Sequence, residues 1–174
     1  MTKSVDNTKD SELGILERRT IEAEIIAPIY EEMVAAFGED AAVGIVDRAI
    51  RTAAISSAQS FASREKSGTS LRSFAELQSL WTKDDALVVD ILNSTETKFD
   101  YDVHRCRYAE TYKAMGLAKI GHLLSCNRDA VFCQGYDPRI RLQRTQTIME
   151  GASHCDFRYS MDSSSQAERT ASSE

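Results

Sequence analysis

Apolar residues follow a helical period through the first part of the chain. From Ser11 the spacing predicts a helix that Pro28 either kinks or breaks, with a stop near Gly38. The residues that carry this pattern are Leu13, Leu16, Ile21, Ile25 and Ile29. Further helical patterns cover about residues 40–66 and 71–81. The first of these is rich in alanine, so we expect it to approach another helix closely.

The period changes after residue 94. Alternating or short apolar runs predict strands over 95–103, 130–132, 139–148 and 154–160. The last two runs are separated by five residues, which predicts a hairpin. Helical patterns lie between the strands, over residues 105–115 and 117–124.

This order predicts an α+β fold in which a helical N-terminal half packs on a small antiparallel sheet formed mainly by residues 95–160. We expect one domain over residues 11–161, helical over 11–94 and mixed over 95–161. Polar, aperiodic residues 1–10 and 162–174 are expected to be disordered tails.

Composition agrees with a single globular domain: 174 residues, 42% hydrophobic and 28% charged. No run of eighteen apolar residues occurs, so we expect no membrane span. The polar N-terminus does not resemble a secretory leader, and the four cysteines are expected to be reduced thiols. These features together predict a cytoplasmic protein.

Charge is distributed unevenly. The net charge of −6 argues against a nucleic-acid partner, yet residues 101–161 carry nine basic and six acidic side chains. This segment also contains all four cysteines and all three histidines. We therefore expect the chemistry in this segment, with a small anionic molecule as the substrate.

No phosphate loop, dinucleotide fingerprint, HExxH or Gly-x-Ser-x-Gly motif is present. The candidate reactive residues form three clusters, His104–Arg107, Cys126–Asp129 and His154–Asp156. The cysteines lack C-x2-C spacing, so a zinc site would need tertiary contacts, and we predict no metal or cofactor. A metal-dependent hydrolase that uses the same Cys, His and Asp residues is an alternative.

Two of these clusters offer a nucleophile. Cys106 lies between Arg105 and Arg107 at a predicted helix start, where positive charge favours a thiolate. Cys155 is adjacent to His154, but neighbouring side chains of a strand point to opposite faces, so a base for Cys155 must come from elsewhere.

The strand predicted over residues 139–148 contains three arginines. Arg139 and Arg141 are typical of a solvated face of a sheet. Alternatively, Arg144 together with Thr145 could bind a substrate carboxylate, because the guanidinium group matches the geometry of that ligand.

Residues 101–159 resemble the L-2-amino-thiazoline-4-carboxylic acid hydrolase family, a group of small bacterial proteins. The matching motifs, in order, are DVHRCRYAE at 102–110, CNRD at 126–129, LQRTQTIMEG at 142–151 and CDF at 155–157. The resemblance implies hydrolysis of a cyclic amidine-type C–N bond, as in the conversion of L-2-amino-thiazoline-4-carboxylate to N-carbamoyl-L-cysteine. It also places Cys106, Cys126 and Cys155 on the family's cysteine positions and Asp129 and Asp156 on its acidic ones.

The working hypothesis is a ring-opening hydrolase. Cys155 or Cys106 is the nucleophile, with His104 and Asp129 as the acid/base pair and Arg144 or Arg107 binding the carboxylate. The remaining alternative is a small-molecule-binding domain without catalysis. The alanine-rich segment 41–58 could support a homo-oligomer, but packing inside the domain is the favoured interpretation.

Overall fold

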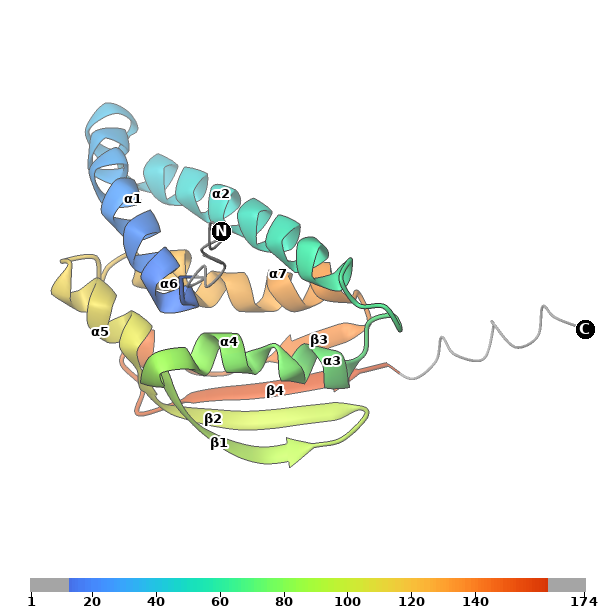
Figure 1. Cartoon of the computed structure of the whole chain (residues 1–174). Coiled ribbons are helices and arrows are strands. Elements are labelled where there is room, and N and C mark those ends of the chain that lie inside the picture. The colour runs from blue at the N-terminus through green and yellow to red at the C-terminus, as the bar shows by residue number, and fades with distance from the viewer. Residues whose placement is uncertain (1–12, 163–174) are drawn as a thin grey trace, which may run out of the picture.

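Helices cover one face of a four-stranded antiparallel sheet in the computed structural model of the chain, which describes residues 13–162 (Figure 1). The helices are α1 (Ile15–Phe37), α2 (Glu39–Ala62), α3 (Leu71–Glu76), α4 (Gln78–Thr82), α5 (Arg107–Ala114), α6 (Gly121–Leu124) and α7 (Cys126–Tyr136). The strands are β1 (Leu87–Ser94), β2 (Lys98–Cys106), β3 (Ile140–Gln143) and β4 (Cys155–Met161), in the spatial order β1-β2-β4-β3. The expected α+β class is therefore confirmed. The two predicted tails lie outside the described residues, apart from Asp162.

The two central strands supply the buried face of the sheet. Alternate residues of β2, among them Tyr101 and Val103, are buried, and so are alternate residues of β4, beginning with Cys155. The register places Tyr101 opposite Phe157 and Val103 opposite Cys155. The period-two pattern thus sends one row of side chains from each strand toward the helices. The predicted pairing of the last two strands is also confirmed, because β3 and β4 are antiparallel neighbours.

Small residues bring α2 and α7 together. The buried face of α2 includes Ala54 and Ala58, and Gly135 of α7 packs against this face. A Cβ atom added at Gly135 would lie 3.1 Å from Ala58 Cβ and 3.1 Å from the backbone of Ile55. The alanine-rich segment therefore serves a helix contact inside the chain.

The core consists of two clusters of buried residues. One lies between the sheet and the helices above it, and the other lies among α1, α2, α5 and α6. Trp81, Leu87 and Cys106 are half-buried and pack against both clusters. The junction of the two clusters is where the candidate site lies.

Four sequence-based predictions about the elements need correction. Residues 87–94, placed in the helical half, form strand β1, whose Val, Ile and Leu content suits a strand. Residues 130–132 lie within helix α7, because a short apolar run does not distinguish a buried helix from a strand. The strand over 139–148 stops at Gln143. Pro28 lies inside α1 without ending it.

No helix within residues 13–162 combines the length and hydrophobicity that a membrane span requires.

Candidate functional site

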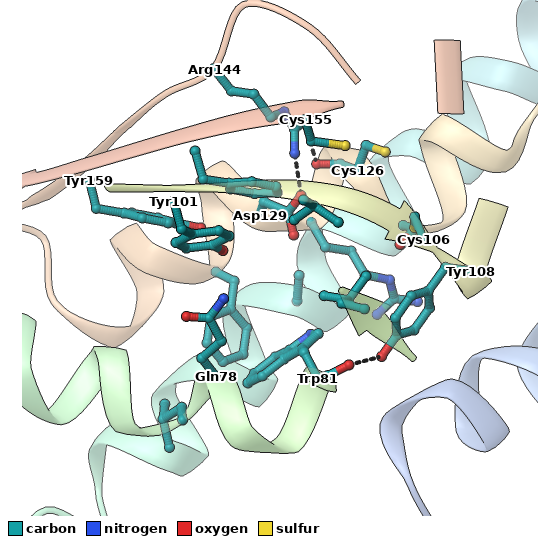
Figure 2. Close-up of a pocket in the computed structure, with 18 of the residues that line it drawn as sticks. Gln78, Trp81, Tyr101, Cys106, Tyr108, Cys126, Asp129, Arg144, Cys155 and Tyr159 are labelled. Carbon is teal, nitrogen blue, oxygen red and sulfur yellow. Dashed lines mark hydrogen bonds and ion pairs between the residues drawn. The ribbon is translucent and has the colours of Figure 1, made fainter. Parts of the chain in front are cut away.

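A cavity of about 110 Å³ lies between the inner face of the sheet and the helices (Figure 2). Its walls come from residues far apart in the sequence, including Arg19 of α1, Trp81 of α4, Tyr101 of β2 and Asp129 of α7. A cavity of about 150 Å³ accommodates a benzene ring in a protein interior, so this space suits a ligand of about one ring.

Three of the four cysteines line this cavity. Cys106 is the last residue of β2, Cys126 is the first residue of α7, and Cys155 is the first residue of β4. Figure 2 shows the side chains of Cys126 and Cys155 at the same end of the cavity. Cys133 does not line the cavity; it is fully buried one turn after Asp129 in α7, where its thiol donates to the Ala130 carbonyl at 3.0 Å. The tertiary structure thus brings together the three cysteines that the family resemblance selects.

The cavity thiols are protonated at neutral pH. Burial raises the pKa of Cys106 to about 11, although backbone groups of Ala109 and Tyr108 oppose this shift. Burial also raises the pKa of Cys126 and of Cys155. A nucleophilic thiolate would therefore have to form by proton transfer to a base within the site.

The arginines that flank Cys106 do not activate it. Arg105 forms an exposed ion pair with Glu110 at 2.8 Å, and Arg107 donates to the Asp84 carbonyl at 2.7 Å. Both guanidinium groups are thus occupied outside the cavity, which neither residue lines. The expected roles of Arg107 as a carboxylate ligand and of both arginines as activators of Cys106 find no geometric support.

An ion pair between Asp129 and Arg144 forms part of the cavity wall. Arg144 also donates to the Cys126 carbonyl at 3.1 Å and lies over the Phe157 ring, 5.0 Å from its centroid. Burial raises the pKa of Asp129, while Arg144 opposes the shift. A carboxylate with a raised pKa can accept and return a proton nearer to neutral pH.

Two arginines at the helical end of the cavity share a single carboxylate. Arg19 donates to Glu22 at 2.7 Å, and Arg128 donates to Glu22 at 2.8 Å and to the Leu124 carbonyl at 2.7 Å. Both arginines line the cavity, whereas Glu22 does not. The cluster therefore has one positive charge in excess. No sequence motif reveals this pair, because Arg19 lies in a helix that carries none.

Aromatic rings from the sheet and from the helices also line the cavity. Tyr101 and Phe157 are stacked with centroids 4.8 Å apart, and Trp81 meets Phe132 edge-on at 5.2 Å. Gln78 lies beside Trp81 in Figure 2, and its side-chain Nε2 is buried without a hydrogen-bond partner among the described residues. A buried donor without a partner is costly and points to a ligand that accepts from it.

His104 and His154 lie outside the cavity. Their rings are 6.0 Å apart, and His104 is exposed at the end of β2, where its side chain alternates with the inward-facing Val103. His154 contacts the side chain of Gln146. His104 and Asp129 are therefore on opposite faces of the sheet, and the expected acid/base pair does not form.

Asp156 has a structural role at the same outer face. It accepts hydrogen bonds from the Thr145 backbone at 2.9 Å, the Thr145 hydroxyl at 2.6 Å and the Gln146 backbone at 2.9 Å. Burial alone would raise the pKa of Asp156, but these hydrogen bonds hold it below its usual value. Asp156 and Thr145 thus fix the loop that follows β3, and neither lines the cavity.

Within residues 13–162, no group of three or more His, Cys, Asp or Glu side chains is arranged to hold a metal ion.

Comparison with known proteins gives a family and a fold. The model of a family described as L-2-amino-thiazoline-4-carboxylic acid hydrolase matches residues 18–159. No curated protein sequence matches the chain. The phenol-responsive sensory domain of the transcription activator PoxR, solved with phenol, is similar in fold at 13% identity and a TM-score of 0.52, covering 85% of this chain and 79% of that one. A trafficking protein particle complex subunit 3 from Naegleria fowleri, covalently bound to palmitic acid, matches at 10% identity and a TM-score of 0.48, covering 83% of this chain and 95% of that one.

Proposed function

Because the chain belongs to the L-2-amino-thiazoline-4-carboxylic acid hydrolase family, we propose that it is a hydrolase that opens a small carboxylated heterocycle containing a cyclic amidine. The observation that carries this proposal is the convergence of Cys106, Cys126 and Cys155 with the Asp129–Arg144 ion pair on one cavity. A thiol, a carboxylate and a fixed cation are groups that catalyse attack at an sp² carbon.

The bond that breaks follows from the chemistry of the product. An N-carbamoyl thiol retains both carbon–nitrogen bonds of the amidine carbon. Ring opening to that product therefore adds the oxygen of water to this carbon and breaks the ring carbon–sulfur bond. This assignment replaces the C–N cleavage expected from the resemblance.

Cys155 is the proposed nucleophile. Its sulfur accepts a hydrogen bond from the Ile148 backbone at 3.2 Å, and the positive charge of Arg144 favours its thiolate. Asp129 takes the thiol proton as sulfur adds to the amidine carbon, and returns it to the departing ring sulfur. The product of this step is an isothiourea linked to Cys155. Water then adds to its central carbon and displaces the Cys155 thiol, which leaves the carbamoyl group.

The substrate carboxylate is assigned to Arg19 and Arg128. These side chains share Glu22, so their excess positive charge is available to a bound anion. Arg144, by contrast, is already paired with Asp129. Arg19 and Arg128 are therefore proposed as the carboxylate ligands. They replace Arg144, Arg107 and Thr145, which were expected from the sequence.

Kinetics with a matched control tests the proposal. The substrate is L-2-amino-thiazoline-4-carboxylate, and the product N-carbamoyl-L-cysteine is followed by chromatography. We expect Cys155→Ala to lower kcat by roughly 10³-fold or more, as loss of a covalent nucleophile does. Cys133→Ala removes a buried thiol outside the cavity and should retain turnover. Wild-type activity in Cys155→Ala would contradict the assigned nucleophile, and no turnover by the wild-type chain would contradict the hydrolase itself.

A second candidate function is binding of a small aromatic molecule without turnover. The stacked aromatic wall and the unpartnered Gln78 Nε2 favour it, since together they match a planar ring that carries one hydrogen-bond acceptor. The fold that the chain shares with a phenol-responsive domain is consistent with this function.

Fluorescence distinguishes the two functions. Trp81 is the single tryptophan of the chain and lines the cavity, so its emission reports occupancy. Titration with phenol should give a saturable, stoichiometric change if the protein is a binding domain, and Gln78→Leu should weaken it. An unchanged emission at millimolar phenol would contradict this second function.

A further inference from the structure

The outer face of α1 carries an exposed apolar stripe. Ile21, Ile25 and Ile29 are 46%, 60% and 51% exposed. Because they are four residues apart, they lie on one side of the helix. Figure 1 shows α1 at the edge of the helical layer, and its opposite side, which includes Ala23, packs on the chain. Exposed isoleucines in a continuous row are typical of a contact surface.

The remaining parts of the chain are poor candidates for covering this stripe. Residues 1–12 contain only Met1 and Val5 as apolar side chains larger than alanine, and residues 163–174 contain none. An apolar partner outside the chain is therefore the better match to three isoleucines.

Two unpaired charges flank the stripe symmetrically. Arg18 lies seven residues before Ile25 and Glu32 lies seven residues after it. Seven residues are about two helical turns, so both side chains lie on the same face as the isoleucines. Both are exposed, and no ion pair or hydrogen bond among the described residues involves either side chain.

We propose that this face binds a second copy of the chain, with the two α1 helices antiparallel and a two-fold axis passing at Ile25. In this arrangement Ile21 of one copy lies against Ile29 of the other. Arg18 of each copy meets Glu32 of the other, so the two-fold axis produces two equivalent contacts between opposite charges. A two-fold dimer requires such a self-complementary surface.

The isoleucines and the charges contribute differently. Burial of the apolar stripe supplies the favourable free energy of association. Exposed ion pairs contribute little by themselves, but opposed like charges disfavour a wrong orientation. The charges therefore select the antiparallel register. This inference is independent of the proposed catalytic function.

Charge reversal tests the register directly, with sedimentation equilibrium of the full chain. We expect the wild-type chain to be a dimer. Arg18→Glu should place four acidic side chains across the contact, and Glu32→Arg four basic ones. Each variant alone should weaken dimerisation about ten-fold or more. An equimolar mixture of the two should form a heterodimer in which both contacts again join opposite charges, and the double variant R18E/E32R should dimerise like wild type.

Ile25→Glu tests the apolar contribution and should give a monomer. Since all three substituted positions are exposed, circular dichroism of each variant should remain that of the wild type. A monomeric wild-type chain at about 100 μM, a concentration well above the micromolar Kd of a typical weak dimer, would overturn the proposal. It would also be overturned by a dimer that neither Ile25→Glu nor the single charge reversals weaken, because that dimer would use another face.

Discussion

At the scale of single residues, the surroundings of the cavity thiols explain why these thiols stay protonated in the absence of substrate. Cys106, Cys126 and Cys155 all have pKa values above that of a free thiol, and burial is the largest cause in each case. The protonated thiol is the form that an apolar pocket favours. In the proposed function the thiolate is generated only when Asp129 accepts its proton next to bound substrate.

Alkylation of Cys106 should depend steeply on pH. With a pKa of about 11, its thiolate fraction at pH 7.5 is about 100-fold lower than that of an unperturbed thiol. We expect the rate of iodoacetamide labelling to rise about ten-fold per pH unit between pH 7 and pH 10, because deprotonation limits it. Peptide-resolved mass spectrometry measures this rate separately for each cysteine. A plateau in the Cys106 rate below pH 9 would show that its pKa is not raised.

At the scale of elements, helix α7 links the core to the site. Its first turns carry Cys126, Arg128 and Asp129 to the cavity, while Gly135 near its other end contacts α2. The position of the end that lines the cavity thus depends on how closely α7 approaches α2. Ala54 of α2 itself lines the cavity, so a displacement at this contact would reach the site.

Gly135→Ala should destabilise the protein. The added methyl group would lie 3.1 Å from the backbone of Ile55, which cannot move independently, and overpacking of this kind costs about 1–3 kcal/mol. Gly44→Ala is the matched control, because the nearest atom there is the mobile Arg48 guanidinium at 3.3 Å. There the higher helix propensity of alanine should stabilise by about 0.5–1 kcal/mol. Urea denaturation measures both values, and equal effects would contradict the assigned packing.

At the scale of the whole molecule, the cavity lies at the junction of the two core clusters. Its lining combines aromatic rings with arginine side chains. The sheet, α4 and α7 contribute aromatic rings, and α1 and α7 contribute the arginine cluster. A ligand that spans the cavity can therefore place a planar ring on one wall and an anionic group on the other. This arrangement matches a carboxylated heterocycle.

Arg19→Met should selectively weaken binding of a carboxylated substrate. Loss of a charge-assisted contact should raise KM about 10- to 100-fold. The value of kcat should change little, because the contact stabilises the bound substrate and the transition state equally. The carboxamide analogue of the substrate should show no such rise. Arg72→Met, on the exposed surface of α3, controls for loss of a positive charge. An equal KM change for the carboxylate and the carboxamide would remove Arg19 from the carboxylate site.

Local sequence determined much of this protein. Period-two alternation predicted strands β2 and β4, and the alanine content of α2 predicted a close helix contact. Both predictions succeed because the signals depend on residues only a few positions apart. The resemblance to a known family, carried by short motifs in order along the chain, selected Cys106, Cys126 and Cys155 as one set.

Only the tertiary structure decided which charged groups accompany those thiols. The sequence placed Asp156 next to Cys155, yet strand alternation directs Asp156 to the outer face, away from the cavity. His104 lies two residues from Cys106, but the register of β2 with β1 skips from Val103 to Arg105, and this irregularity leaves His104 exposed while Cys106 lines the cavity. Conversely, Arg19 joins Arg128 from more than a hundred residues away through the packing of α1 on the remainder of the chain. Adjacency along a chain and adjacency in space differ because each strand sends neighbouring side chains to opposite faces, while long-range packing assembles the walls of the site.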